Sequence, residues 1–209
     1  MLYILEKTDL LGAGFEKAAV PFLSRQRLEK ISALRSPHDR TDGCAVYLLL
    51  RLGLFREYGI SDAPEFIFGE HGKPYLKGSS ICFNMSHAKN AVCCIVSSCE
   101  NAVDITDIRE VKNNVMRRVC DDDELRLIEA SEDKNRTFLK MWTRKECLSK
   151  LSGKGMSESF RRLTDKIPES RQLRTIERDD YILSYWSQTE ETINYIKEKE
   201  LLDSMKALV

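Results

Sequence analysis

The chain has 209 residues, with 33 Lys and Arg against 33 Asp and Glu, so its formal net charge is zero. Hydrophobic residues at 42% and charged residues at 32% are typical of a globular protein and exclude the disordered and collagen-like classes. The neutral balance argues against a general nucleic-acid-binding protein, because such proteins need a basic surface to neutralise phosphates.

Local signals predict a strand, then helices, then strands in the first half of the chain. Ser36 followed by Pro37 is a helix start, and Gly59 ends that helix after Tyr58. Between Arg25 and Arg56 there are seven basic and three acidic residues, so the neutral chain contains a positive region. The other expected elements are a strand at Leu2–Leu5, an amphipathic helix at Phe22–Leu34, a strand at Phe66–Phe68, and strands near Ile81–Met85 and Ala91–Ser97.

The second half repeats the order of strand, helices and strands. The longest helix of this half is expected at Asp133–Leu151 and is closed by Gly153. The remaining expected elements are a strand at Ala102–Ile108, helices at Val111–Val119 and Asp121–Ala130, strands at Gln172–Glu177, Tyr181–Ser187 and Thr192–Lys197, and a helix at Leu201–Leu208. This order predicts two α+β halves, residues 1–100 and 101–209, rather than one continuous βαβ sheet.

The start of the chain has no cationic segment followed by a long apolar one, and its apolar runs are far shorter than a membrane span. Its seven cysteines form no CxxC pair, which predicts reduced thiols rather than a disulfide framework. We therefore expect a soluble, cytoplasmic protein without a membrane partner.

Four short motifs carry residue types suited to phosphate chemistry. A turn contains Gly72-Lys73-Pro74, and a strand ends in Phe83-Asn84-Met85-Ser86-His87. Asp104 lies inside an apolar strand, where a carboxylate needs a partner or a metal; the alternative is that it caps a neighbouring turn. Glu146 and Lys150 lie four residues apart on one helix face, which is commonly a solvated ion pair. A carboxylate from a strand and one from a helix, with a lysine nearby, would suit Mg²⁺ and a phosphate group.

In this order and spacing, the motifs resemble the 4′-phosphopantetheinyl transferases of the long, surfactin-synthetase-activating type, over about Arg40 to Gly155. The resemblance implies a pseudo-dimer of two similar α+β halves with the active site in the cleft between them. It implies transfer of the 4′-phosphopantetheine moiety of coenzyme A (CoA) to a serine of an acyl or peptidyl carrier protein, with release of 3′,5′-ADP. The partners would be CoA and a carrier protein of fatty-acid, polyketide or nonribosomal-peptide synthesis, and the enzyme would be a monomer.

The resemblance also implies roles for individual residues. Asp104 and Glu146 would bind Mg²⁺ (or Mn²⁺), and Glu146 and Lys150 would be catalytic, with Lys150 either stabilising charge or accepting the serine proton. The implied CoA-binding residues are Arg40, Lys73, Pro74, Ser86, His87, Asp104 and Lys150.

The chain departs from this pattern at Thr106, where many relatives have a second acid two residues after the strand aspartate. The departure leaves a second hypothesis open, a non-catalytic CoA- or carrier-binding relative with a degraded metal site. A third hypothesis, nucleic-acid binding by the basic face of Arg25–Arg56, is disfavoured by the neutral charge balance.

Overall fold

The computed structural model describes residues 1–153 and 172–208 of the chain. Gly155, the expected end of the motif-bearing stretch, lies outside the described residues. The elements of the first part are β1 (Leu2–Glu6), α1 (Ala13–Ala19), α2 (Arg25–Ser32), α3 (Pro37–Tyr58), β2 (Phe66–Phe68), β3 (Pro74–Leu76), β4 (Cys82–His87) and β5 (Ala91–Ser97). The later elements are β6 (Asn101–Asp107), α4 (Asn113–Val119), α5 (Asp122–Ala130), α6 (Lys134–Ser152), β7 (Leu173–Glu177), β8 (Tyr181–Ser187), β9 (Ile193–Ile196) and α7 (Glu198–Lys206).

Helix α3 forms where its capping residues predict it. The Ser36 hydroxyl accepts a hydrogen bond from the Asp39 amide, Pro37 occupies the first turn, and Gly59 ends the helix with φ of 68°. A left-handed φ of this kind carries no steric cost for glycine. Since α3 is apolar almost all round, it is buried along most of its length and forms the centre of the largest core cluster.

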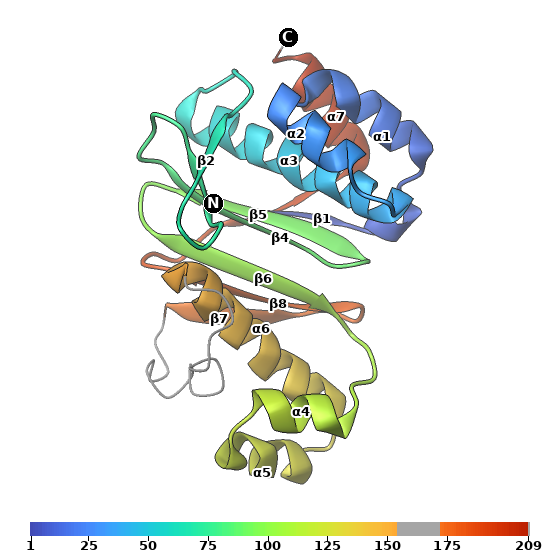
Figure 1. Cartoon of the computed structure of the whole chain (residues 1–209), viewed down its shortest axis with the longest axis vertical. Coiled ribbons are helices and arrows are strands. Elements are labelled where there is room, and N and C mark those ends of the chain that lie inside the picture. The colour runs from blue at the N-terminus through green and yellow to red at the C-terminus, as the bar shows by residue number, and fades with distance from the viewer. Residues whose placement is uncertain (154–171, 209) are drawn as a thin grey trace.

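The first sheet has the strand order β4-β5-β1-β9, and α3 covers one of its faces (Figure 1). Strand β9 pairs parallel with β1, so the end of the described chain returns to the first sheet. Helix α7 follows β9, and its side chains Leu201 and Met205 lie in the same core cluster as α3. The last strand and helix therefore pack on the first half, while the division at residue 100 stays a proposal.

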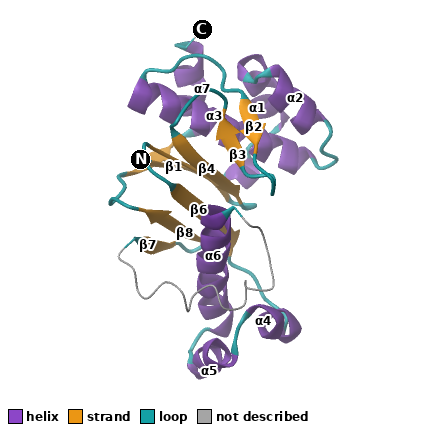
Figure 2. Cartoon of the chain, turned by 60° about the vertical axis from the view of Figure 1, so that its left-hand side comes forward, coloured by secondary structure: helices purple, strands orange, loops and turns teal. Residues whose placement is uncertain are grey.

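A two-stranded sheet pairs β2 with β3. The second large sheet has the order β6-β8-β7, and α6 runs alongside β6 and β8 (Figure 2). Ala102 of β6 packs with Cys147 and Leu148 of α6, so α6 covers the face of this sheet that is turned away from the first sheet. A core cluster containing Leu2, Ile4, Val103 and Leu183 joins the facing surfaces of the two sheets. Pairing of β6 with β8 is continuous from Asn101 to Asp107. Without a bulge, Asp104 and Thr106 share the face of β6 toward α6.

The two sheets have the same local topology. In the first half, β1 pairs antiparallel with β5, the second strand of the β4–β5 hairpin, and β4 lies on the other side of β5. In the second half, β6 pairs antiparallel with β8, the second strand of the β7–β8 hairpin, and β7 lies on the other side of β8. A long helix, α3 or α6, precedes each hairpin in the chain. The fold of the described residues is therefore mixed α+β, and the order of elements that the sequence predicts is confirmed.

Within the described residues, no helix combines the length and the apolar character that crossing a membrane requires. All seven cysteines are free thiols, as predicted, and five of them are buried.

Candidate active site

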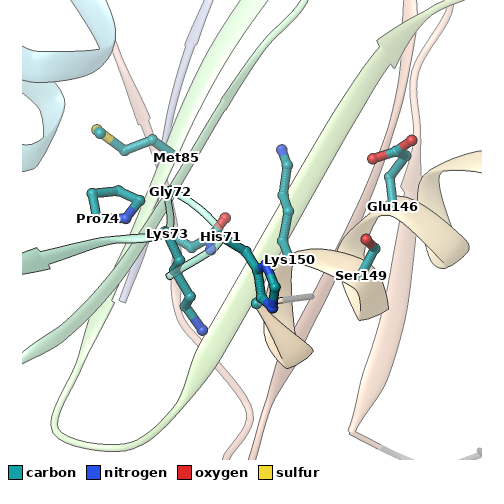
Figure 3. A pocket seen from close by; sticks show the side chains of 10 residues that line it. His71, Gly72, Lys73, Pro74, Met85, Glu146, Ser149 and Lys150 are labelled. Atoms are coloured by element: carbon teal, nitrogen blue, oxygen red, sulfur yellow. The ribbon is translucent and has the colours of Figure 1, made fainter. Parts of the chain in front are cut away.

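A cavity of about 380 Å³ lies between the turn before β3, strand β4 and the C-terminal half of α6 (Figure 3). It is lined by His71, Gly72, Lys73, Pro74, Asn84, Met85, Glu146, Ser149, Lys150 and Gly153. The cavity brings together the turn motif, the strand motif and the helix motif, which are far apart in the sequence.

The Lys150 side chain lines this cavity and belongs to a compact cluster of polar groups whose other members, Ser86, Val103 and Asp104, are not part of the lining. The Lys150 Nζ atom lies 2.7 Å from Asp104 Oδ1 and 2.7 Å from Ser86 Oγ, and it donates to the Val103 carbonyl at 3.2 Å. Ser86 Oγ in turn donates to Asp104 Oδ1 at 3.0 Å. Asp104 is 7% exposed, so its carboxylate is satisfied by partners from β4 and α6 and does not cap a turn.

Glu146 is the second carboxylate of the site and lies half-buried one helical turn before Lys150. Burial raises the pKa of the Glu146 carboxyl, the nearby charge of Asp104 raises it further, and the Lys150 ammonium opposes both effects. Because the two carboxylates are close enough to interact electrostatically, the site favours a bound cation.

Few side chains of this site can serve as metal ligands. Among the described residues, no three His, Cys, Asp or Glu side chains lie close enough to hold a metal together. Mg²⁺ is commonly bound by one or two carboxylates, with water and substrate phosphates completing its shell, so Asp104 and Glu146 fit this ion in the presence of a phosphate ligand.

Two neighbours of Asp104 do not add a carboxylate to this set. Thr106 is buried on the same face of β6. Asp107 accepts hydrogen bonds from the amides of Lys89 and Asn90 at 2.8 and 3.0 Å, so both of its oxygens cap the turn between β4 and β5.

A second cavity of about 290 Å³ opens on the other side of Met85, between α2, the start of α3 and the end of β4. It is lined by Arg27, Lys30, Ile31, Leu34, Asp39, Gly43, Val46, Met85, Ser86 and His87. Partial desolvation of the His87 ring lowers its pKa, and the charge of Lys150 lowers it further. Two cations and one carboxylate line each cavity, namely Arg27, Lys30 and Asp39 in the second and Lys73, Lys150 and Glu146 in the first.

Comparisons with known proteins agree with this constellation. The model of the 4′-phosphopantetheinyl transferase superfamily matches residues 101–200, which include Asp104, Glu146 and Lys150. The second half of the chain is therefore similar to this superfamily. A 4′-phosphopantetheinyl transferase of Bacillus subtilis is 27% identical over 151 residues, or 70% of this chain and 67% of that protein.

Two further relatives match shorter stretches of the chain. The 4′-phosphopantetheinyl transferase psf-1 of Bacillus pumilus is 30% identical over 105 residues, or 49% of this chain and 45% of that protein. The 4′-phosphopantetheinyl transferase gsp of Aneurinibacillus migulanus is 30% identical over 89 residues, or 42% of this chain and 37% of that protein. The chain therefore spans less than half the length of these two superfamily members.

The sequence-predicted residues are placed unequally around the two cavities. Lys150, Glu146, Lys73 and Pro74 line the first cavity. The Lys73 ammonium, however, donates to the Leu151 carbonyl at 3.0 Å, at the end of α6. Its charge thus lies where the negative end of the helix dipole favours it.

Arg40 lies outside the lining of both cavities. Its guanidinium pairs with Glu16 on α1 at 3.0 Å and donates to the carbonyls of Leu34 and Arg35. Arg27 and Lys30 are the cations that face the second cavity instead. A role for Arg40 at a phosphate stays a prediction.

Sequence reasoning assigned no role to Asn84, although it lines the first cavity and is 8% exposed. Its Oδ1 atom accepts a hydrogen bond from the Val103 amide at 3.4 Å. The sequence feature that could have identified Asn84 is its spacing from Ser86, because residues two apart share one face of a strand.

Proposed function

We propose that the chain transfers the 4′-phosphopantetheine moiety of CoA to a serine of an acyl or peptidyl carrier protein and releases 3′,5′-ADP, with Mg²⁺ as cofactor. The observation that carries this proposal is that Glu146 and Lys150 line one cavity and that Asp104 pairs with Lys150 and interacts electrostatically with Glu146, in a chain that matches this superfamily. The two carboxylates suit a metal ion, and the ammonium suits a diphosphate, so the three groups together fit a diphosphate with its metal better than they fit a metal or a diphosphate alone.

Asp104 and Glu146 would hold the metal together with oxygens of the CoA diphosphate. A bound Mg²⁺ or Mn²⁺ would neutralise the negative charge that grows on the leaving 3′,5′-ADP. Phosphoryl transfer depends mainly on positioning and on this neutralisation.

Lys150 supports the same transfer as a cation. Its ammonium donates to Ser86, Val103 and Asp104, so the three hydrogens of a protonated lysine are all engaged. We therefore assign Lys150 to charge stabilisation near the diphosphate rather than to removal of the serine proton. Glu146, whose pKa is raised, is the better-placed proton acceptor on this chain.

The remaining CoA contacts follow the two cavities. Pro74 and Lys73 would adjoin the adenine, and His87 the separate 3′-phosphate, with Arg40 as a further predicted contact that lines neither cavity. Arg27 and Lys30 in the lining of the second cavity support this division because a phosphate monoester needs several donors.

The matching order of strands in the two sheets supports a pseudo-dimer of similar halves, residues 1–100 and 101–209, with CoA in the cleft between them. Because each half already supplies part of the site, no second subunit is needed and we propose a monomer.

The test is labelling of purified carrier proteins by a fluorescent CoA analogue in the presence of Mg²⁺. Carriers from fatty-acid, polyketide and nonribosomal-peptide synthesis are compared side by side. Asp104→Ala and Glu146→Ala should each abolish labelling, whereas Asp203→Ala, which removes an exposed carboxylate on α7, should not. Labelling that survives both site substitutions would refute the assignment.

The second candidate, a CoA- or carrier-binding protein without activity, is favoured by the buried threonine at position 106. It predicts CoA binding in calorimetry but no labelling at any concentration of Mg²⁺ or Mn²⁺. The same set of experiments therefore separates the two candidates.

A further inference from the structure

Helix α6 carries both Glu146 and Lys150, so its placement on the second large sheet decides where these two side chains lie. Apolar side chains of α6 pack on Ala102 of β6. Apolar contacts are not directional, so they permit small shifts of a helix along a sheet. Directional contacts are what can fix Glu146 and Lys150 relative to Asp104.

One directional contact lies about two helical turns before Lys150, where the Thr143 hydroxyl meets the Ser184 hydroxyl of β8 at 2.9 Å. The Ser184 hydroxyl also lies 3.0 Å from the hydroxyl of Thr175 on β7. Thr143 and Ser184 are both 0% exposed. We call these three side chains the hydroxyl network.

Backbone carbonyls at one end determine the direction of the hydrogen bonds in this network. Thr143 Oγ1 donates to the carbonyls of Leu139 and Lys140, each at 3.1 Å. Because a hydroxyl has one hydrogen, Thr143 accepts from Ser184, and Ser184 accepts from Thr175. Every hydrogen of the network is therefore used, which offsets the cost of burying these polar groups.

Ser184 is also the direct neighbour of Asp104. Strands β6 and β8 place these two residues opposite each other, so their side chains lie on the same face of the sheet, toward α6. Helix α6 runs alongside both strands (Figure 2). Thr143, Glu146 and Lys150 lie three and four residues apart and share one face of this helix. The helix thus contacts β8 through Thr143 and β6 through Lys150, with Glu146 between them in the chain.

Two polar contacts on different strands fix the direction of the helix as well as its position. Such a restraint matters here because Asp104 and Glu146 are close enough to repel each other electrostatically. A hydrogen bond between neutral hydroxyls does not depend on the charge of either carboxylate. The hydroxyl network can therefore hold α6 in place whether or not a cation is bound.

We propose that Thr143 and Ser184 are positioning residues, which hold α6 on β8 and thereby set the spacing of Glu146 from Asp104 for a metal ion. Both are fully buried and line neither cavity, so they act through the two carboxylates. The inference rests on the proposed function for its effect on metal and CoA binding, but the contact between the hydroxyls can be measured without either ligand.

The first measurement is a double-mutant cycle in urea unfolding, with Thr143→Val, Ser184→Ala and the double variant. The double variant should lose less than the product of the two single effects on the unfolding equilibrium constant, by roughly fivefold, because both single changes remove the same hydrogen bond. Thr143→Ser, which keeps the hydroxyl, should retain most of the stability. Effects that simply multiply would show that the hydroxyls are not coupled, and the proposal would be overturned.

The second measurement is calorimetric titration of the full chain with CoA over a series of Mg²⁺ concentrations. The wild type should bind CoA more tightly with Mg²⁺ than without it. In Thr143→Val and in Ser184→Ala, the Mg²⁺ concentration that gives half of this gain should rise roughly tenfold, because the ligands of the metal are no longer held at their spacing. The affinity for CoA without Mg²⁺ should stay unchanged, and Thr143→Ser should restore the wild-type Mg²⁺ requirement.

Thr41 provides a matched control on another helix. Its buried hydroxyl donates to the Pro37 carbonyl of its own helix, α3, at 3.1 Å, and it lines neither cavity. Thr41→Val should lower the free energy of unfolding but leave the Mg²⁺ requirement unchanged. An equal rise of the Mg²⁺ requirement in Thr41→Val would show that only general stability is at stake, which contradicts the proposal.

The remaining outcomes separate this proposal from the proposed function. A loss of CoA affinity without Mg²⁺ in Thr143→Val would show that the hydroxyl serves CoA binding itself, which also contradicts the proposal. If the wild type does not bind CoA more tightly with Mg²⁺, the proposed function fails, and the double-mutant cycle still decides whether the hydroxyls hold α6 on the sheet. If Thr143→Val does not fold, Ser184→Ala alone is carried through the calorimetry with the same expected result.

Discussion

The carboxyl group of Asp42 is buried in the first turns of α3, where its titration should control stability. Asp42 is 1% exposed, and its Oδ1 atom has no hydrogen-bond partner among the described residues. Burial raises the pKa of Asp42 to about 7, and the charges of Asp39 and Asp107 also raise it. The His38 imidazole and the Thr8 hydroxyl act in the opposite direction and lower this pKa. His38 Nε2 lies 3.4 Å from Asp42 Oδ2.

The sign and size of the effect follow from this pKa. An unfolded aspartate titrates near pH 3.9, so between about pH 4 and pH 7 the unfolded chain loses this proton while the folded chain keeps it. The contribution of Asp42 to the free energy of unfolding is therefore fully present below about pH 4 and is lost as the pH rises toward 7. A difference of about three pK units corresponds to about 4 kcal/mol, and because His38 shares the titration we expect about 2–4 kcal/mol.

The perturbation is Asp42→Asn, and the assay is urea unfolding of both proteins at intervals from about pH 4 to pH 8. The free energy of unfolding of the wild type should fall by about 2–4 kcal/mol relative to that of the variant over this range and then stay level. Asp39→Asn removes an exposed carboxyl on the same turn and serves as the control. Parallel curves for wild type and Asp42→Asn would show that the carboxyl is not desolvated, and the reasoning would fail.

Three further predictions concern other parts of the fold. Lys145 is 0% exposed and lies 2.6 Å from Glu124; Glu124→Ala should lower the free energy of unfolding by about 3–5 kcal/mol in urea, and adding Lys145→Met should recover part of the loss. Gly53→Ala would place a Cβ 2.9 Å from a valine methyl and should lower the free energy of unfolding by about 1–3 kcal/mol in the same assay. Gly14→Ala has open space around it and should instead stabilise α1 by about 0.5–1 kcal/mol. Thr106→Glu adds a carboxylate on the face of β6 toward α6 and should lower the Mg²⁺ concentration for half-maximal labelling; an unchanged value would show that position 106 does not reach the metal.

Elements with strong local signals could be predicted from the sequence, and elements defined by distant partners could not. The bounds of α3 follow from Ser36 and Gly59, which act on their own backbone. Strand β9 was expected, but its parallel pairing with β1 joins residues 191 positions apart, and no local pattern encodes it. Helix α1 was not predicted, because it is short and contains Gly14.

The candidate site shows the same limit. Glu146 and Lys150 line the same cavity, and their spacing of four residues predicts that they share one helix face. The lining of the second cavity by Arg27 rather than Arg40 depends on the phase of α2 against α3, and on Glu16 of α1 pairing with Arg40. Asn84 was passed over because its partner is a backbone amide on another strand, and a sequence pattern does not show backbone partners.

Charge in the two cavities is mixed rather than separated. Arg27, Lys30 and Asp39 line the second cavity, and Lys73, Lys150 and Glu146 line the first. Each cavity thus has two cations and one carboxylate, although the charges of the whole chain sum to zero. Two cations attract a phosphate group, whereas the single carboxylate repels it unless a metal ion lies between them. A net charge of zero therefore does not argue against a ligand with a few phosphate groups, because the local excess of cations and not the total charge of the chain acts on such a ligand.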